Sequence, residues 1–281
     1  MTFADLDVSK RLERAEGYAC AQFAVARRRL FPDSGAEWIE CGGAYAVFDG
    51  PDSPVTQTFG LGLFEPLNAA ILESIEAFFV SRGAPIDLEV SPLAGVPALD
   101  LLCARGYRPI EVSNVMMQPV APVQATSRLG EHVRVRAIGP DEGRVWADVS
   151  SRGWSSSHPE LKPFLEGMAS IATARDHGIC FLAEIEGTPG AAGTLCLHDG
   201  VALFGGSATV PELRRRGLQS ALLHARMQFA HAHGCDLAMM VAAPGSDSQR
   251  NAERIGFRIA YTRTKWRKAA REIGAAALTP Q

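Results

Sequence analysis

Hydrophobic and polar positions along the first part of the chain predict helices separated by short strands. Apolar residues recur at helical spacing in three segments, residues 8–30, 67–81 and 96–103. Phe31-Pro32-Asp33 ends the first of these helices. Shorter runs predict one or two strands around Gly42-Gly43, and the strand candidates as a whole are residues 37–48, 55–63, 86–90 and 107–117.

A similar pattern follows residue 132. Clean alternation over residues 133–138 predicts a strand, and Pro140 with the acids after it opens a helix whose apolar face includes Trp146. The serine-rich stretch 150–157 predicts a loop around Trp154, followed by a helix over residues 159–174. Apolar runs then predict three antiparallel strands, joined by turns at 187–190 and at Asp199-Gly200, over residues 181–186, 192–197 and 201–207.

An internal repeat relates the two parts of the chain. With Gly83 set against Gly234, an offset of 151 (234 − 83), the helix before each glycine and the Gly-aromatic pair after it also correspond. The alternative is that such internal similarity is common to any α/β chain and does not reflect a duplication. We interpret the repeat as two copies of one unit. The expected divisions are a first unit at residues 1–120, a linker at 121–132, a second unit at 133–267 and a tail at 268–281.

Composition narrows the class of protein. The 281 residues are 47% hydrophobic and 21% charged, as in soluble globular proteins. A net charge of −3 and a pI near 6.2 argue against a nucleic-acid binder. The six cysteines show no CxxC spacing, which predicts buried thiols in a reducing compartment and no metal site. Early acids at Asp5 and Asp7, and the lack of a long apolar run, predict no signal peptide, no membrane span and a cytoplasmic location.

The stretch from residue 202 to 223 carries the candidate chemistry. It begins as a strand, breaks at Val210-Pro211, passes three arginines and Gly217, and becomes a helix at Leu218. The first N–H groups of a helix lack intrahelical partners and lie at the positive end of its dipole, so they bind anions. The arginines could instead be a solvated helix start. Positive charge there opposes the dipole, however, which favours phosphate binding, and glycine lets a phosphate approach the backbone.

These residues resemble a known family. Arg214-Arg215-Arg216-Gly217-Leu218-Gln219 is similar to the R-x-x-G-x-G/A signature of the GCN5-related N-acetyltransferases (GNAT), although Gln219 stands where Gly or Ala is usual. Residues 248–257, which end in Gly256-Phe257, resemble the family's fourth helix. The resemblance spans roughly residues 133–267. It implies an α/β (α+β) fold of two tandem GNAT-like acyl-CoA N-acyltransferase units, each with a mixed, mostly antiparallel sheet flanked by helices.

The first copy is expected to lack the phosphate site. The repeat sets Leu63 against Arg214 and Pro66 against Gly217, with Glu65 between them. Proline removes a donor N–H and glutamate repels phosphate, although Pro66 can still be the first residue of a helix. This copy is expected to pack on the second and shape the acceptor pocket, or to bind something else.

The resemblance implies acetyl-CoA as co-substrate, without a metal. The resemblance implies that the strand before the arginine turn lines the acyl arm, with Ser207 among its lining residues. An N–H near Thr209 or Val210 would polarise the thioester carbonyl. The residues expected to bind acetyl-CoA are Ala208, Thr209, Val210, Arg214, Arg215, Arg216, Gly217, Leu218, Gln219, Ser220, Asn251 and Arg254.

The implied reaction is direct acetyl transfer to an amine, which must lose a proton. No base is identified, because Glu184, Glu186, His198 and Asp199 are each better explained as solvated. Where the family often has a tyrosine acid this chain has Ala252, which makes Tyr261 the candidate acid.

The acceptor is left open among small amines, antibiotics, amino acids and protein N-termini, with Trp154 as a candidate contact and core packing as its alternative. Homodimer formation is compatible with this scheme. A non-catalytic acyl-CoA-binding or sensor protein is the main alternative. A nucleotide-dependent enzyme is disfavoured, because the phosphate-loop and dinucleotide motifs are missing.

Overall fold

The structure, a computed structural model, describes residues 3–121, 132–157 and 159–268. The first half of the chain contains α1 (Leu6–Leu30), β1 (Glu37–Cys41), β2 (Ala44–Phe48), β3 (Gln57–Phe59), α2 (Ala69–Val80), β4 (Asp87–Val90), α3 (Val96–Ala104) and β5 (Tyr107–Pro119). The strand expected over residues 55–63 is much shorter, because Gly60 and Gly62 adopt φ of +77° and +75° and turn the chain. The expected linker 121–132 and tail 268–281 fall almost entirely outside the described residues.

The second half contains β6 (Val133–Ala137), α4 (Gly143–Trp154), α5 (Lys162–Ala174), β7 (Gly178–Ile185), β8 (Thr188–His198), β9 (Val201–Thr209), α6 (Leu218–Ala232), β10 (Leu237–Ala242), α7 (Asp247–Arg254) and β11 (Arg258–Lys268). The predicted loop at residues 150–157 is wrong, because α4 continues to Trp154. Ser150, Ser151 and Gly153 are buried there, and the Ser151 hydroxyl donates to the carbonyl of Asp148 at 3.1 Å. The loop was predicted from serine content alone, whereas these serines lie in a close-packed helix end.

All the described strands lie in one sheet of 11 strands, in the order β1-β2-β3-β4-β11-β5-β10-β9-β8-β7-β6. Neighbours are antiparallel except for β3 with β4 and β9 with β10. This confirms the predicted fold class of a mostly antiparallel sheet flanked by helices. The sequence did not predict that the sheets of the two units would join into one.

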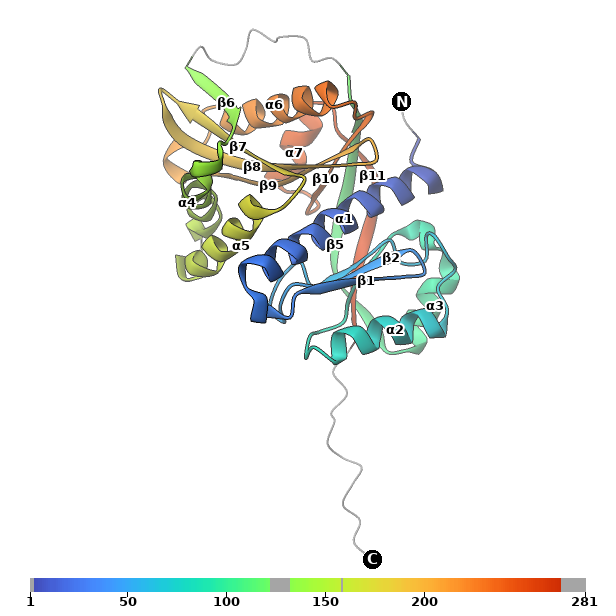
Figure 1. The fold of residues 1–281 in the computed structure, drawn as a ribbon. Coiled ribbons are helices and arrows are strands. Elements are labelled where there is room, and N and C mark those ends of the chain that lie inside the picture. Colours follow the sequence, from blue (N-terminus) through green and yellow to red (C-terminus); the bar gives the residue numbers. More distant parts are fainter. Residues whose placement is uncertain (1–2, 122–131, 158, 269–281) are drawn as a thin grey trace, which may run out of the picture.

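The two halves exchange their last strands. β5, from the first half, pairs with β10 of the second, while β11, from the second, pairs with β4 of the first. β5 and β11 also pair with each other, from Arg258 opposite Met117 to Lys268 opposite Tyr107 (Figure 1). Each half therefore supplies a strand that completes the sheet of the other.

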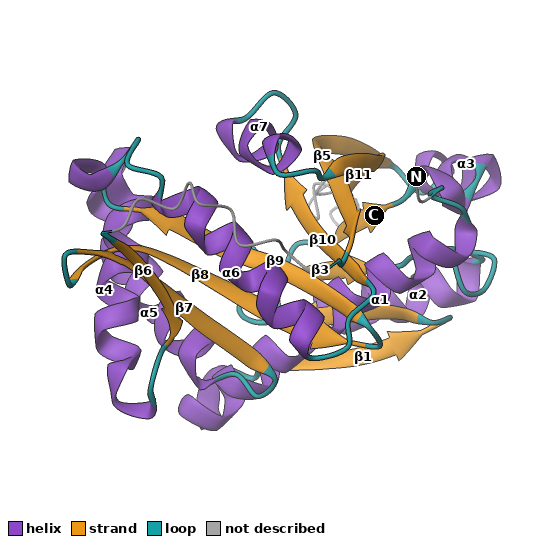
Figure 2. Cartoon of the chain, turned by 90° about the horizontal axis from the view of Figure 1, so that it is seen from above, coloured by secondary structure: helices purple, strands orange, loops and turns teal. Residues whose placement is uncertain are grey.

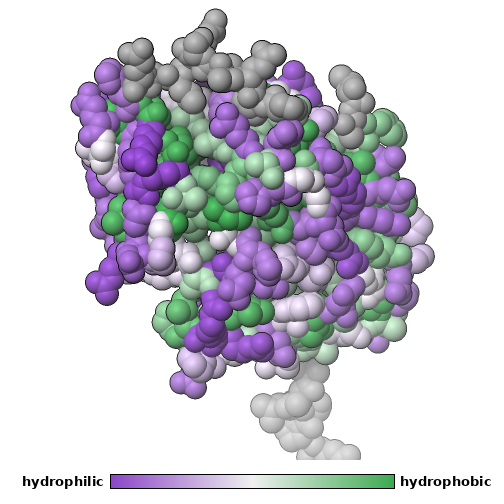
Figure 3. Space-filling view, turned by 45° about the horizontal axis from the view of Figure 1, so that its top comes forward, coloured by the Kyte–Doolittle hydropathy of each residue, from purple (hydrophilic) through white to green (hydrophobic). Residues whose placement is uncertain are grey.

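Helices cover both faces of this sheet (Figure 2). Along β7, Leu182 packs with Trp146 of α4, whereas the next position back, Phe181, packs with Leu222 of α6. Successive side chains of a strand point to opposite faces, so α4 and α5 lie on one face and α6 on the other. On the space-filling face in Figure 3, hydrophilic and hydrophobic residues lie in interspersed patches.

Helix α1 spans the junction between the halves. Its Leu12 packs with Leu237 and Met239 of β10, and its Ala21 and Ala24 pack with residues of β2. One helix of the first half thus buries strands of both halves. No helix within the described ranges is long and apolar enough to cross a membrane.

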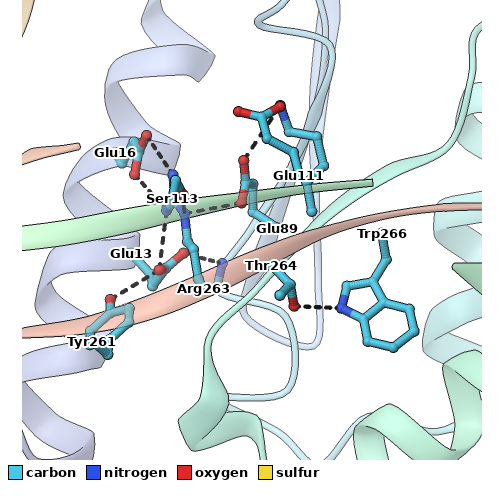
Figure 4. Close-up of polar contacts among 11 residues, drawn as sticks. Glu13, Glu16, Glu89, Glu111, Ser113, Tyr261, Arg263, Thr264 and Trp266 are labelled. Atoms are coloured by element: carbon cyan, nitrogen blue, oxygen red, sulfur yellow. Dashed lines mark hydrogen bonds and ion pairs between the residues drawn. The ribbon is translucent and has the colours of Figure 1, made fainter. Parts of the chain in front are cut away.

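A buried ionic network fastens α1 to the exchanged strand (Figure 4). The guanidinium of Arg263 in β11, only 2% exposed, lies 3.2 Å from Glu13 and 2.7 Å from Glu16 of α1. It also lies 3.1 Å from Glu89 of β4, whose pKa is raised by burial. Removing one member of such a buried pair typically costs about 3–5 kcal/mol, because the other charge is left uncompensated.

The strand exchange makes the halves interdependent. We expect residues 133–281 expressed alone to show no cooperative thermal unfolding by circular dichroism, because β10 loses β5 and β11 loses both neighbours. Residues 1–126 and 127–281 expressed together from two genes should instead co-purify and unfold as one unit. An isolated 133–281 fragment that unfolds at the temperature of the full chain would contradict this interdependence.

Candidate functional site

A cleft of about 900 Å³ lies between the end of β9, the start of α6, α7 and the end of α4. It brings together residues that the sequence placed far apart. The expected site residues that line it are Trp154, Ala208, Thr209, Arg214, Arg215, Gly217, Leu218, Gln219, Ser220, Asn251 and Arg254.

The cleft follows from the separation of two parallel strands. β9 and β10 pair only from Val201 with Leu237 to Leu203 with Met239. Beyond that point both strands continue without pairing, to Thr209 and Ala242. Their backbone polar groups in this region are left open to a ligand.

A bulge in β9 marks the deep part of this separation. The register with β8 shifts between the pairs Ala192–Ala208 and Thr194–Gly205, so β9 has an extra residue there. Gly206 adopts a φ of +56°, a conformation that glycine tolerates. The bulge lies beside Ser207, which is on the cleft wall.

The N-terminus of α6 opens into the cleft. Gly217 caps the helix with a φ of +83° and provides no side-chain hydrogen bond. The next three residues, Leu218 to Ser220, line the cleft, and the first bond of the helix is donated by Ala221 to the Gly217 carbonyl. A Cβ at Gly217 would meet nothing within 4 Å, so glycine is needed for the backbone conformation and the space beside it is open.

The corresponding helix of the first half closes its own N-terminus. The Asn68 side chain caps α2 by accepting the N–H of Ile71 at 3.0 Å. Pro66 is not the first helical residue, as the sequence suggested, because α2 begins at Ala69. Phe64 packs under the guanidinium of Arg14 at 4.2 Å. The first copy thus satisfies one N-terminal donor of its helix with a side chain, whereas no side chain caps α6.

The three arginines have different environments. Arg214 donates to the carbonyls of Thr209 and Gly153 at 3.2 Å each and to Ser156 Oγ at 2.6 Å. Its guanidinium therefore fastens the turn to the C-terminal end of α4, where a cation is favourable. Arg215 is exposed with a φ of +63°, and Arg216 is exposed but does not line the cleft. Arg254 of α7 adds positive charge to the opposite wall.

Of the two amides considered for the thioester, that of Val210 is occupied. Its N–H donates to the carbonyl of Gly190 at 2.9 Å, and Val210 is 2% exposed and does not line the cleft. Successive amides of a strand point to opposite sides. The N–H of Thr209 therefore points away from β8, toward the gap between β9 and β10.

Tyr261 is not at the cleft, which corrects its assignment as a candidate acid. Its hydroxyl donates to Glu13 of α1 at 3.0 Å (Figure 4). Its ring packs with Leu12 and Val115. Burial raises its pKa well above the usual value, which holds the phenol neutral. β11 joins the sheet of the first half, so its residues lie on the far side of β5 from the cleft.

The acids and the histidine considered as bases also lie elsewhere. Glu184 accepts hydrogen bonds from Arg136 at 2.8 Å and 3.2 Å. His198 stacks on Tyr18 with ring centroids 4.0 Å apart, and burial lowers its pKa. Neither side chain lines the cleft. Among the described residues no group of three or more His, Cys, Asp or Glu side chains could hold a metal ion.

Sequence reasoning missed some wall residues, including Gly153, Ser156 and Arg250. A Cβ at Gly153 would lie 2.6 Å from the Cβ of Ala208 and 3.0 Å from the nitrogen of Thr209. This glycine lets α4 touch β9 beside the gap. A glycine in a helix is a sequence signal for such close approach, but the expected loop hid it.

Comparison with known proteins identifies the fold. Residues 145–257 match the model of the Acetyltransferase (GNAT) family. The chain is similar to a solved GCN5-related N-acetyltransferase from Kribbella flavida, with 17% identity, a TM-score of 0.60 and coverage of 90% of this chain and 97% of that chain. A GCN5-related N-acetyltransferase from Sphaerobacter thermophilus has 15% identity and a TM-score of 0.55, with coverage of 90% of this chain and 91% of that chain.

A tandem GNAT protein from the clavulanic acid biosynthesis pathway is also similar over nearly the whole chain. It has 12% identity and a TM-score of 0.54, with coverage of 96% of this chain and 98% of that chain. At these identities the likenesses show the fold, here two GNAT-like units in tandem. Among proteins with curated descriptions, none matches the sequence.

The contact between α4 and β9 is testable with paired glycine variants. We expect Gly153→Ala to lower the free energy of unfolding by about 1–3 kcal/mol in urea titrations, because the added methyl overpacks the β9 backbone. Gly167→Ala in α5 is the matched control, since nothing lies within 4 Å of its Cβ. That variant should be neutral or more stable by about 0.5–1 kcal/mol. Equal stability of the two variants would contradict the close contact.

Proposed function

The chain carries a GNAT-family acetyltransferase domain over residues 145–257, and from this premise we propose that it transfers the acetyl group of acetyl-CoA to an amine. The proposal includes the division into a first unit of residues 1–120 that lacks a phosphate turn and a second, catalytic unit of residues 133–267. One observation carries it: the uncapped N-terminus of α6 and the separated strands β9 and β10 meet in one cleft.

The phosphate end of acetyl-CoA is assigned to the start of α6. A charge-assisted hydrogen bond contributes about 1.5–3 kcal/mol, so the amides of Leu218, Gln219 and Ser220 can hold a pyrophosphate with little help. Arg215 and Arg254, exposed on the cleft walls, add positive charge. The acyl arm would then run along β9 into the gap.

Transfer forms a bond from the amine nitrogen to the thioester carbon and breaks the carbon–sulfur bond. The amine loses a proton, and the departing thiolate takes one up. A lysine-like amine must first be deprotonated at pH 7, which costs about 4–5 kcal/mol. Asp247, which pairs with Arg250, is the acid that lines the described cleft, so the proton is proposed to leave through water. The N–H of Thr209 would polarise the carbonyl.

The acceptor is proposed to approach beside Trp154, whose side chain is 54% exposed at the end of α4. A large exposed aromatic at the mouth of a polar cleft suits contact with a small molecule or peptide. We assign the acceptor to the amines and to no narrower class.

Calorimetry with acetyl-CoA, ATP and NAD tests the cofactor, and release of CoA thiol over a panel of amines tests the reaction. We expect the protein to bind acetyl-CoA but neither ATP nor NAD, and to release CoA thiol with at least one amine. The cleft walls offer no histidine or glutamate among the described residues, which favours a non-catalytic acyl-CoA-binding protein as the second candidate. Binding without thiol release from any amine would support that candidate and reject transfer.

The phosphate turn is tested by two nearly isosteric substitutions. We expect Gly217→Asp to weaken acetyl-CoA binding by at least about 100-fold, roughly 2.7 kcal/mol, because it places a carboxylate where phosphate is proposed to lie. Gly217→Asn is the matched control, since asparagine has the same size, carries no charge and tolerates positive φ. It should lose about tenfold or less. Similar dissociation constants for the two variants in calorimetry would refute the assignment.

A further inference from the structure

A fully buried arginine lies beneath the bulge of β9. Arg226 of α6 is 0% exposed, and burial lowers its pKa to about 9. Its guanidinium donates to the carbonyl of Thr194 at 2.9 Å, to that of Gly205 at 3.3 Å and to Ser207 Oγ at 2.8 Å. These acceptors are neutral, as is the Phe204 ring, whose centroid lies 4.9 Å from the guanidinium carbon. No carboxylate in the part of the chain that the structure describes offsets the burial of this charge.

Packing and stability alone do not account for this residue. Burying a charge without a counter-charge costs several kcal/mol, and hydrogen bonds to neutral acceptors offset this cost only in part. The strands are nevertheless shaped around the guanidinium. A Cβ at Gly193 would lie 3.2 Å from Arg226 Cζ, a tight contact, so glycine opposite the bulge leaves room for the guanidinium. A positive charge held at this position can stabilise negative charge that develops in the adjoining cleft.

Ser207 connects this charge to the cleft. Because its oxygen accepts a hydrogen bond from Arg226 Nη2, its own hydrogen points elsewhere, and Ser207 lines the cleft. A hydroxyl polarised in this way is a stronger donor. Of the β9 residues on the cleft wall, Ser207 lies nearest Leu203, where β9 and β10 come together. Among these wall residues, Ser207 is therefore the one farthest along the chain from Gly217, where the phosphates are proposed to bind.

We propose that the Ser207 hydroxyl donates a hydrogen bond to the thioester carbonyl oxygen of bound acyl-CoA. In this proposal Arg226 is a positioning residue that orients the hydroxyl and supplies positive charge from beneath the bulge. The bond strengthens as negative charge develops on that oxygen during attack, and no proton is transferred through Ser207. The inference rests on the proposed function and adds a catalytic donor to it.

Isotope-edited infrared spectroscopy of carbonyl-¹³C acetyl-CoA bound to the full chain tests the hydrogen bond without needing the acceptor. We expect the bound carbonyl band of the wild type at lower frequency than that of free acetyl-CoA. Ser207→Ala should move the band back toward the free value, and Ser207→Thr, which keeps the hydroxyl, should preserve the shift. The dissociation constant of Ser207→Ala should rise by about tenfold or less, as for one hydrogen bond. With an amine that the wild type accepts, its kcat should fall about 10²- to 10³-fold.

Arg226→Met separates positioning from packing. We expect the folded variant to lose the band shift, with a lower melting temperature because the carbonyls of Thr194 and Gly205 lose their donor. A merely structural arginine would lose stability and leave the band of the folded fraction unchanged. Should Arg226→Met fail to fold, Arg226→Lys keeps a charge but only one donor centre, and its band should lie between those of the wild type and Ser207→Ala.

The outcomes distinguish this inference from the proposed function. A wild-type shift that persists in Ser207→Ala overturns the hydrogen bond and leaves acetyl-CoA binding intact. A wild-type protein that does not bind acetyl-CoA rejects the proposed function and this inference together.

Discussion

The pairing of β5 with β11 is the constraint on which the rest of the structure depends. These two long strands lie side by side across the centre of the sheet, and each also completes the sheet of the other half. β10 therefore has β5 along one edge, which leaves its other edge free to separate from β9 beyond Met239. The cleft can form because β5 holds β10 along the edge that faces away from the cleft.

The first half reaches the cleft through the same strand. Asn114 of β5 donates to Gln249 of α7 at 3.1 Å and accepts from Thr262 of β11 at 2.7 Å. Gln249 in turn accepts the N–H of Gly245 at 2.8 Å, which fixes the turn that leads into α7. Because α7 carries Asn251 and Arg254 to the cleft wall, the first half, which lacks the arginine turn, still helps to position the cleft of the second. Asn68 caps α2 from an extended conformation with a φ of −132°, whereas Gly217 leaves α6 open from a left-handed one with a φ of +83°, so the two helix starts differ in backbone as well as in side chain.

Local patterns predicted most elements, because helix spacing, turn residues and glycine positions act over a few residues. Asp199-Gly200 forms the expected turn, with φ of +44° and +75° between β8 and β9. The residues of the phosphate turn and of α7 were also expected at one site, from the family resemblance. Partner choice between strands was not predictable, since the alternation in β5 and β11 records which face is buried and not which neighbour is paired. Tyr261 was misassigned for this reason: its position along the chain follows the second unit, but its strand lies beside the first.

Two buried arginines show how the same desolvation cost is met in different ways. Arg263 lies within 3.2 Å of each of three carboxylates, those of Glu13, Glu16 and Glu89, so its charge is offset inside the protein and joins α1 to the exchanged strand. Arg226 has only neutral partners among the described residues, namely carbonyl and hydroxyl acceptors and the face of the Phe204 ring. The first arrangement is complete without a ligand, because the cation and the anions are both present. The second is electrostatically incomplete, and the side on which it is incomplete, through Ser207, is the wall of the cleft.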